Sequence, residues 1–171
     1  MAECKFCGKS GLFFKVDQNG LCPKCAPQVT YAVVTLVDEL NRYVLWLQQS
    51  VSARDADQLF QQIMRIATQL YEYEKKGIPT LNPSPSSYLR DKDKEWDRYI
   101  SIGLEREFDR LLKAVFDLKT PKAKIKRIEK FATIVSEYKQ KMTDPSSVSK
   151  VEQKIEKLLK QTENELVVKK S

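Results

Sequence analysis

The sequence contains no histidine among its 171 residues. Histidine is the usual general base near neutral pH, and it is also the common partner of serine and cysteine nucleophiles and a frequent ligand of catalytic metals. Its absence removes most hydrolytic mechanisms, and no other pattern of residues points to a catalytic group. We therefore expect that the protein is not an enzyme and has no catalytic residues.

Glycine and proline are scarce, with 5 and 7 residues, whereas hydrophobic residues make up 42% of the chain. This composition predicts a globular, mainly helical protein. No apolar run approaches the roughly 20 residues that cross a bilayer, and the first residues lack the pattern of a secretory signal. We expect a cytoplasmic protein with no membrane partner.

Cysteine is confined to the first 25 residues, where it forms two C-x2-C pairs: Cys4 with Cys7, and Cys22 with Cys25. Four such cysteines form two disulfides in an exported protein or one metal site in a reducing cell. Because we expect a reducing compartment, the spacing predicts one Zn²⁺ ion bound by four thiolates. Four cysteine ligands close a tetrahedral shell, so this zinc is expected to be structural.

A small β-hairpin is predicted between the two cysteine pairs. Residues 12–16 favour a strand, and the Asn19-Gly20 pair favours a tight turn because it tolerates positive φ. Phe13 and Phe14 are neighbours on this strand, so their side chains point to opposite faces. Such a module has one small core, and one of the two phenylalanines is therefore a candidate exposed contact residue.

These residues resemble the Cys4 treble-clef and zinc-ribbon modules, in which a knuckle, a hairpin and a second C-x2-C pair enclose the metal. In treble clefs the second pair leads into a helix, as Cys22 to Pro27 does here. The resemblance covers residues 1–27, and the helical remainder suggests no family. Modules of this kind bind nucleic acids, bind proteins or only add stability, so the resemblance implies a zinc site without selecting a function.

The rest of the chain has apolar side chains at three- and four-residue spacing, which is typical of amphipathic helices. The predicted helices cover residues 27–50, 54–76, 87–118, 120–142 and 147–168. Short connections favour antiparallel neighbours. The predicted fold class is therefore mainly α, with a zinc-binding module over 1–26 followed by an elongated antiparallel bundle of about five helices over 27–171.

Several helix ends are marked in the sequence. Ser52 or Asp55 is expected to cap the second helix, and Gly77 is expected to end it. Thr120 and Pro121 form a good N-cap and first-turn pair for the fourth helix. Gly103 is the expected weak point of the third helix.

Positive charge is concentrated in the last third of the chain, where residues 119–171 contain 14 lysines and arginines against 7 acidic residues. Residues 119–130 alone hold six basic residues and one glutamate. At the start of a helix they could form a positive stripe for nucleic-acid phosphates, with five candidate contacts: Lys119, Lys122, Lys126, Arg127 and Lys130. A solubilising helix face is the favoured alternative, because lysine predominates and no base-reading motif accompanies the stripe.

Acidic residues at the start of the third helix alternate with basic ones. The acidic members are Asp91, Asp93, Glu95 and Asp97. This alternation predicts a solvated, ion-paired helix face rather than a metal site.

Two functional hypotheses remain open. The first is a zinc-stabilised helical adaptor that holds an unidentified protein partner through the zinc module or a groove of the bundle. The second is a nucleic-acid-binding accessory protein that uses the zinc module and the basic stretch 119–130. An exposed apolar stripe could also pair two copies of the chain into a homo-oligomer.

Overall fold

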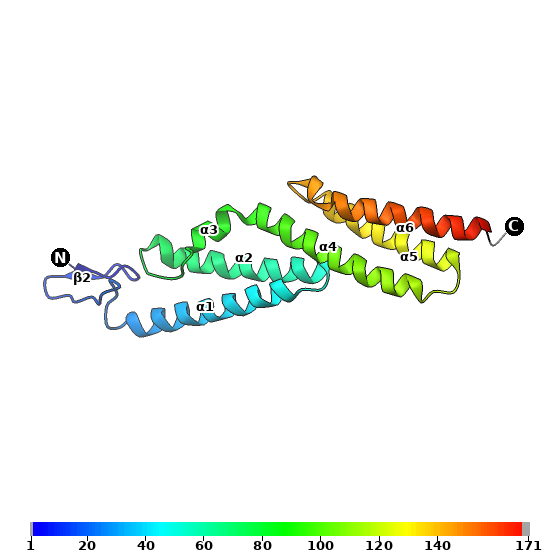
Figure 1. The fold of residues 1–171 in the computed structure, drawn as a ribbon. Helices are drawn as coiled ribbons and strands as arrows, with labels where there is room; N and C mark the ends of the chain where they lie inside the picture. The colour runs from blue at the N-terminus through cyan, green and yellow to red at the C-terminus, as the bar shows by residue number, and fades with distance from the viewer. Residues whose placement is uncertain (1, 169–171) are drawn as a thin grey trace. The chain divides into compact units, whose positions relative to one another are not determined.

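The computed structural model describes residues 2–168, which are mainly helical with a small two-stranded hairpin near the cysteines (Figure 1). Contacts between residues divide the chain into two compact units. Within the described residues, unit 1 comprises 2–48 and 59–92, and unit 2 comprises 49–58 and 93–168. The mainly α class is confirmed, whereas the single elongated bundle stays a prediction. None of the described helices combines the length and the apolar character that crossing a membrane requires.

The hairpin consists of β1 (Ala2–Glu3) and β2 (Ser10–Gly11), which pair antiparallel. These strands flank the first cysteine pair, so the position predicted for the hairpin, between the two pairs, is wrong. Between the cysteine pairs the chain forms a turn at Asp17 instead. The carboxylate of Asp17 accepts hydrogen bonds from the N–H groups of Asn19 and Leu21, both at 2.9 Å, so the amide of Leu21 bonds to this side chain and not to a facing strand.

Unit 1 contains all but the last residue of α1 (Ala26–Gln49), most of α2 (Ala53–Lys75) and α3 (Pro85–Arg90). The helices α1 and α2 lie side by side, and Arg65 of α2 pairs with Glu39 of α1 at 3.5 Å (Figure 1). The buried side chains of α1 recur at helical spacing: Val29, Val33, Leu40 and Leu47. Burial of this apolar stripe stabilises α1 as a helix.

Both ends of α2 follow the sequence signals. The backbone N–H of Asp55 donates to the hydroxyl of Ser52 (3.1 Å), and that hydroxyl donates to the Asp55 carboxylate (2.7 Å). At the other end Gly77 has a φ of 67°, which favours glycine, and its N–H donates to the carbonyl of Glu74. The predicted caps of this helix are confirmed.

Unit 2 contains most of α4 (Lys92–Phe116), α5 (Pro121–Lys139), the short 3₁₀ helix η1 (Pro145–Val148) and α6 (Ser149–Val168). Its helices share a core of apolar side chains from all three long helices, among them Ile100, Leu104, Phe108, Ile128, Val135, Val151 and Ile155. The hydroxyl of Thr120 accepts a hydrogen bond from the N–H of Ala123, so the predicted N-cap of α5 is confirmed.

The helix predicted over residues 87–118 is two helices, α3 and α4, which separate at Asp91. Residues 90–95 are all charged. The segment therefore has no apolar side chain whose burial would stabilise a continuous helix across Asp91. Gly103 does not interrupt α4. A Cβ atom at Gly103 would lie 2.8 Å from the backbone of Ala53, so the glycine permits close packing instead of weakening the helix.

Asp97 is buried, although the alternating charges predict a solvated residue. Its side chain is 4% exposed and accepts hydrogen bonds from the hydroxyl of Thr143 (2.5 Å) and the N–H of Asp144 (2.7 Å). These partners lie in the loop after α5, and no local pattern indicates that this loop would reach α4. Asp97 therefore joins two segments of unit 2.

Candidate metal centre

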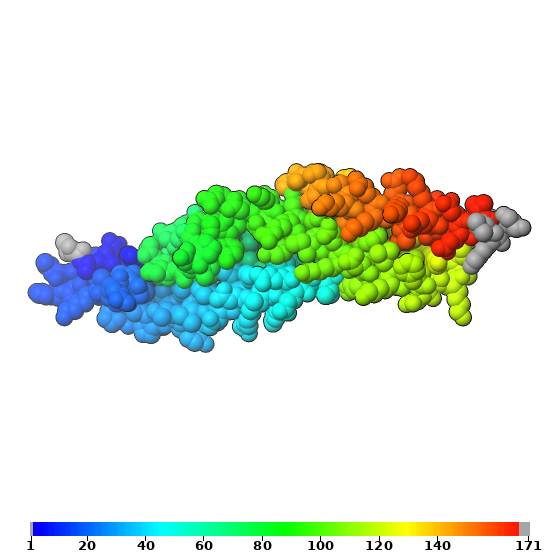
Figure 2. Space-filling model, in the orientation of Figure 1, coloured from blue at the N-terminus to red at the C-terminus, as the bar shows by residue number. Residues whose placement is uncertain are grey.

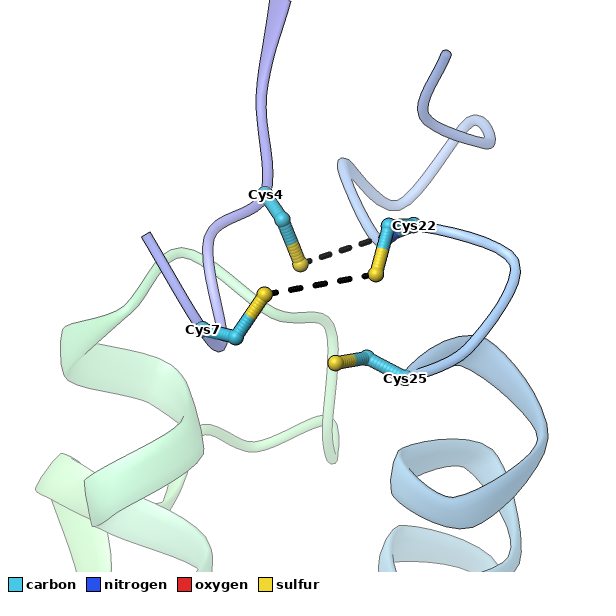
Figure 3. Close-up of side chains that lie close together, drawn as sticks. All are labelled: Cys4, Cys7, Cys22 and Cys25. Carbon is cyan, nitrogen blue, oxygen red and sulfur yellow. Dashed lines mark hydrogen bonds between the residues drawn. The ribbon is translucent and has the colours of Figure 1, made fainter. Parts of the chain in front are cut away.

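The four cysteines come from two short turns that meet in unit 1. Cys4 and Cys7 lie between β1 and β2, and Cys22 and Cys25 immediately precede α1. Figure 3 shows their side chains converging on one point, and their four sulfur atoms all lie within 4.8 Å of one another. These are the four zinc ligands predicted from the sequence, and the fold brings all of them together.

The spacing of the sulfur atoms fits a metal ion. Sulfur atoms about 2.3 Å from a tetrahedral zinc ion lie about 3.8 Å apart, by the geometry of a tetrahedron. The sulfurs of Cys7 and Cys22 are 4.0 Å apart, and all four cysteines are free. A disulfide requires about 2.05 Å. The four thiols could therefore hold one metal ion.

Local backbone geometry creates each turn. Gly8 has a φ of 70°, and its N–H donates to the carbonyl of Cys4 (2.8 Å), which curls the first turn behind its cysteines. The N–H of Cys22 donates to the sulfur of Cys4 (3.3 Å) and so joins the two turns. The carbonyl of Cys25 accepts from Val29, which places the second pair directly on the start of α1.

The surroundings act on the thiols in opposite directions. Hydrogen bonding from the backbone of Cys7 is the main cause that lowers the pKa of the Cys4 thiol to about 6, with a further contribution from Cys22. Burial raises the pKa of the Cys25 thiol to about 12, and hydrogen bonds with the other three cysteines add to this rise. The protein itself thus favours the thiolate of Cys4, the form that binds metals.

The first turn also contacts the end of α2 and the residues just after it, through the two residues between its cysteines. The ammonium of Lys5 donates to the carbonyl of Gly77 (2.8 Å), and the ring of Phe6 stacks on Tyr73 with centroids 6.2 Å apart. The ammonium of Lys76 lies 4.5 Å from the centre of the Phe6 ring. Figure 2 shows the blue N-terminal residues against the green segment beyond α2.

These contacts of Lys5 and Phe6 were not predicted from the sequence. A signal for them is present in the sequence. When both cysteines of a C-x2-C turn face the metal, the two residues between them must point elsewhere, and Phe6 needs an apolar neighbour.

The two candidate contact phenylalanines differ in exposure. Phe13 is 97% exposed and follows Leu12, which is 87% exposed, in a turn after β2. Phe14 is partly buried and lines a small cavity beside the cysteines together with Lys9 and Pro23.

The five basic candidates belong to unit 2, and all are exposed. Lys126, Arg127 and Lys130 lie along a groove formed by α4 and α5, whereas Lys119 and Lys122 do not line it. The sixth basic residue of the stretch, Lys124, pairs with Glu165 of α6 at 2.8 Å. The stretch is therefore not one uniform stripe.

The fold and the site define a mainly helical protein with a four-cysteine cluster that could hold a metal ion. In comparisons with known proteins, no protein family, curated protein or solved structure matches the chain.

Proposed function

We propose that the four cysteines bind one structural Zn²⁺ ion, and that residues 2–26 form a zinc module of treble-clef or zinc-ribbon type. An all-thiolate ligand set favours a soft or borderline ion such as zinc over magnesium or calcium. The distance of 4.0 Å between two of the sulfurs supports this assignment. Four thiolates leave no position for a reacting water, so the ion stabilises the module and performs no chemistry.

The proposed function is that of a non-enzymatic adaptor that uses this module to hold another protein. The observation that carries the proposal is the turn at Leu12 and Phe13, two adjacent large apolar side chains that are 87% and 97% exposed. Phe6 packs the same module on Tyr73 of α2, and Lys5 bonds it to Gly77 just beyond that helix. Large apolar side chains that gather on a surface commonly mark an interaction site.

A binding experiment tests the adaptor function. The immobilised full chain is incubated with a lysate of the cells that produce it and washed in about 0.3 M salt, which screens most surface charge. We expect the wild type to retain proteins that the double variant Leu12→Ser, Phe13→Ser loses. The control variant Tyr31→Ser, Val34→Ser removes two exposed apolar residues from α1 and should retain them. Equal retention by all three proteins contradicts the proposal.

Nucleic-acid binding is a second candidate function. It is favoured by the exposure of the five basic candidates around the start of α5, where the helix dipole adds positive potential. On this hypothesis random-sequence DNA or RNA binds with a steep salt dependence, and reversal of Lys122, Lys126 and Arg127 to glutamate abolishes binding. Unchanged affinity in that variant rules out the basic stretch.

A further inference from the structure

A groove of about 860 Å³ runs along α4 and α5 in unit 2. Its floor is apolar, and six side chains form it: Leu111 and Ala114 from α4, Leu118 just beyond the end of α4, and Ala123, Phe131 and Ile134 from α5. The groove remains open because Ala114 and Ala123 lack the long side chains that would fill it. An apolar floor of this kind is a site for another apolar surface.

Four cationic side chains lie along the same groove: Arg110, Lys126, Arg127 and Lys130. Glu107 is the single carboxylate among its lining residues. Elsewhere on α5, Lys124 pairs with Glu165 and Lys139 pairs with Glu152, both at 2.8 Å. In the part of the chain that the structure describes, Lys126, Arg127 and Lys130 form no such ion pair. Positive charge at the groove is thus available to a partner.

We infer that this groove binds an acidic amphipathic helix of a partner protein. The α5 side of the groove extends from Ala123 to Ile134, about 17 Å at a rise of about 1.5 Å per residue, and accommodates roughly three turns of a bound helix. Apolar side chains of that helix pack on the floor, and its carboxylates face the four cations. The groove shares no residue with the turn at Leu12 and Phe13, so the groove proposal and the adaptor proposal can fail independently.

Nucleic acid is a poorer occupant of this groove. Single-stranded nucleic acids bind through exposed aromatic rings on which bases stack. The one aromatic ring of the floor, Phe131, is buried beneath the surface and contacts Phe108. Phosphates also gain nothing from the six apolar side chains of the floor.

A designed peptide provides the test. The probe is a fluorescent peptide of about 14 residues, with leucines at i, i+3, i+4 and i+7 and with glutamates on the remaining face. Its binding to the full chain is measured by fluorescence anisotropy. We expect saturable binding, and weaker binding of an otherwise identical peptide in which lysine replaces glutamate.

Two variants of the protein locate the binding site. Lys126→Glu combined with Lys130→Glu should weaken the acidic peptide by about tenfold or more, because two attractions become repulsions. Ala114→Trp fills the floor and should weaken binding to a similar extent without changing a charge. The matched control, Lys119→Glu with Lys122→Glu, makes the same charge change at exposed residues outside the groove and should alter affinity less than about twofold. Circular dichroism checks that each variant is folded.

Three results would overturn the inference. They are absence of binding, equal binding of the acidic and basic peptides, and equal losses in the groove variant and the control variant. If random-sequence duplex DNA binds instead, and both charge-reversal variants weaken it equally, the basic stretch serves nucleic acid and the groove is not its site.

Discussion

At the scale of single residues, Cys22 is the ligand whose loss is most informative. Its side chain is 4% exposed, its sulfur lies 4.0 Å from that of Cys7, and its N–H contacts the sulfur of Cys4. We expect Cys22→Ser to abolish stoichiometric metal binding, since three thiolates no longer close the shell. The measurement is zinc content after dialysis.

Lys24→Ser is the control for this variant, because Lys24 lies in the same turn, is exposed and offers no ligand. The control should retain its metal. A full complement of zinc in Cys22→Ser would show that the cluster does not bind the ion as described.

Gly103 gives a second prediction at this scale. A methyl group there would lie 2.8 Å from backbone atoms of Ala53, which cannot move aside like the end of a flexible side chain. We expect Gly103→Ala to destabilise the protein by about 1–3 kcal/mol, reduced by at most about 1 kcal/mol through the better helix propensity of alanine. Urea denaturation measures the change.

Gly11→Ala is the comparison, since its new methyl group would meet the nearest atom at an ordinary 3.7 Å. It should leave the free energy of unfolding within about 0.5 kcal/mol of the wild type. Equal stability of the two variants would mean that the close packing at Gly103 is absent.

At the scale of secondary-structure elements, Asp97 fastens the loop after α5 to α4. We expect Asp97→Ala to destabilise the protein by about 1–3 kcal/mol, because it leaves the N–H of Asp144 and the hydroxyl of Thr143 without their acceptor. Asp93→Ala, at an exposed position one turn earlier, should change stability by less than about 0.5 kcal/mol. Similar unfolding curves for the two variants would contradict this role.

The elements also show which features the sequence could predict. Helix ends set by neighbouring residues were predicted correctly, as at Ser52, Gly77 and Thr120, because a cap depends on atoms only a few positions away. The hairpin position was not predicted, because the Asp17 side chain takes the amide of Leu21. The burial of Asp97 was not predicted either, because it depends on partners that are distant in the sequence. For Asp97 the partner lies 47 positions along the chain.

The cysteine cluster belongs to both categories. The spacing of the two C-x2-C pairs is enough to predict which four residues form the cluster. Its attachment to α2 through Lys5 and Phe6 does not, because Gly77 and Tyr73 lie far from them in sequence. The groove between α4 and α5 likewise required the structure, which separates Lys126 and Lys130 from Lys119 and Lys122.

At the scale of the whole molecule, the metal and the helices should contribute separately to stability. The N-terminal module has two strands of two residues each and cannot bury a core of its own. We expect a chelator to remove hydrogen-exchange protection from the amides of Cys4, Lys5 and Gly8, which bond within the module.

The amides of α4 and α5 serve as the internal control, because unit 2 has an apolar core without cysteine. They should stay protected after chelation. Protection of the module amides without metal would make the ion dispensable for its fold.

The central claim is that one structural metal ion, held by four thiolates, organises the N-terminal module. Native mass spectrometry of the purified full chain tests it most directly, because it distinguishes bound zinc from disulfides by mass. We predict one zinc ion per chain, lost on acidification to leave four free thiols. A folded chain that carries no metal, or that lacks the four hydrogens lost in forming two disulfides, would contradict the account.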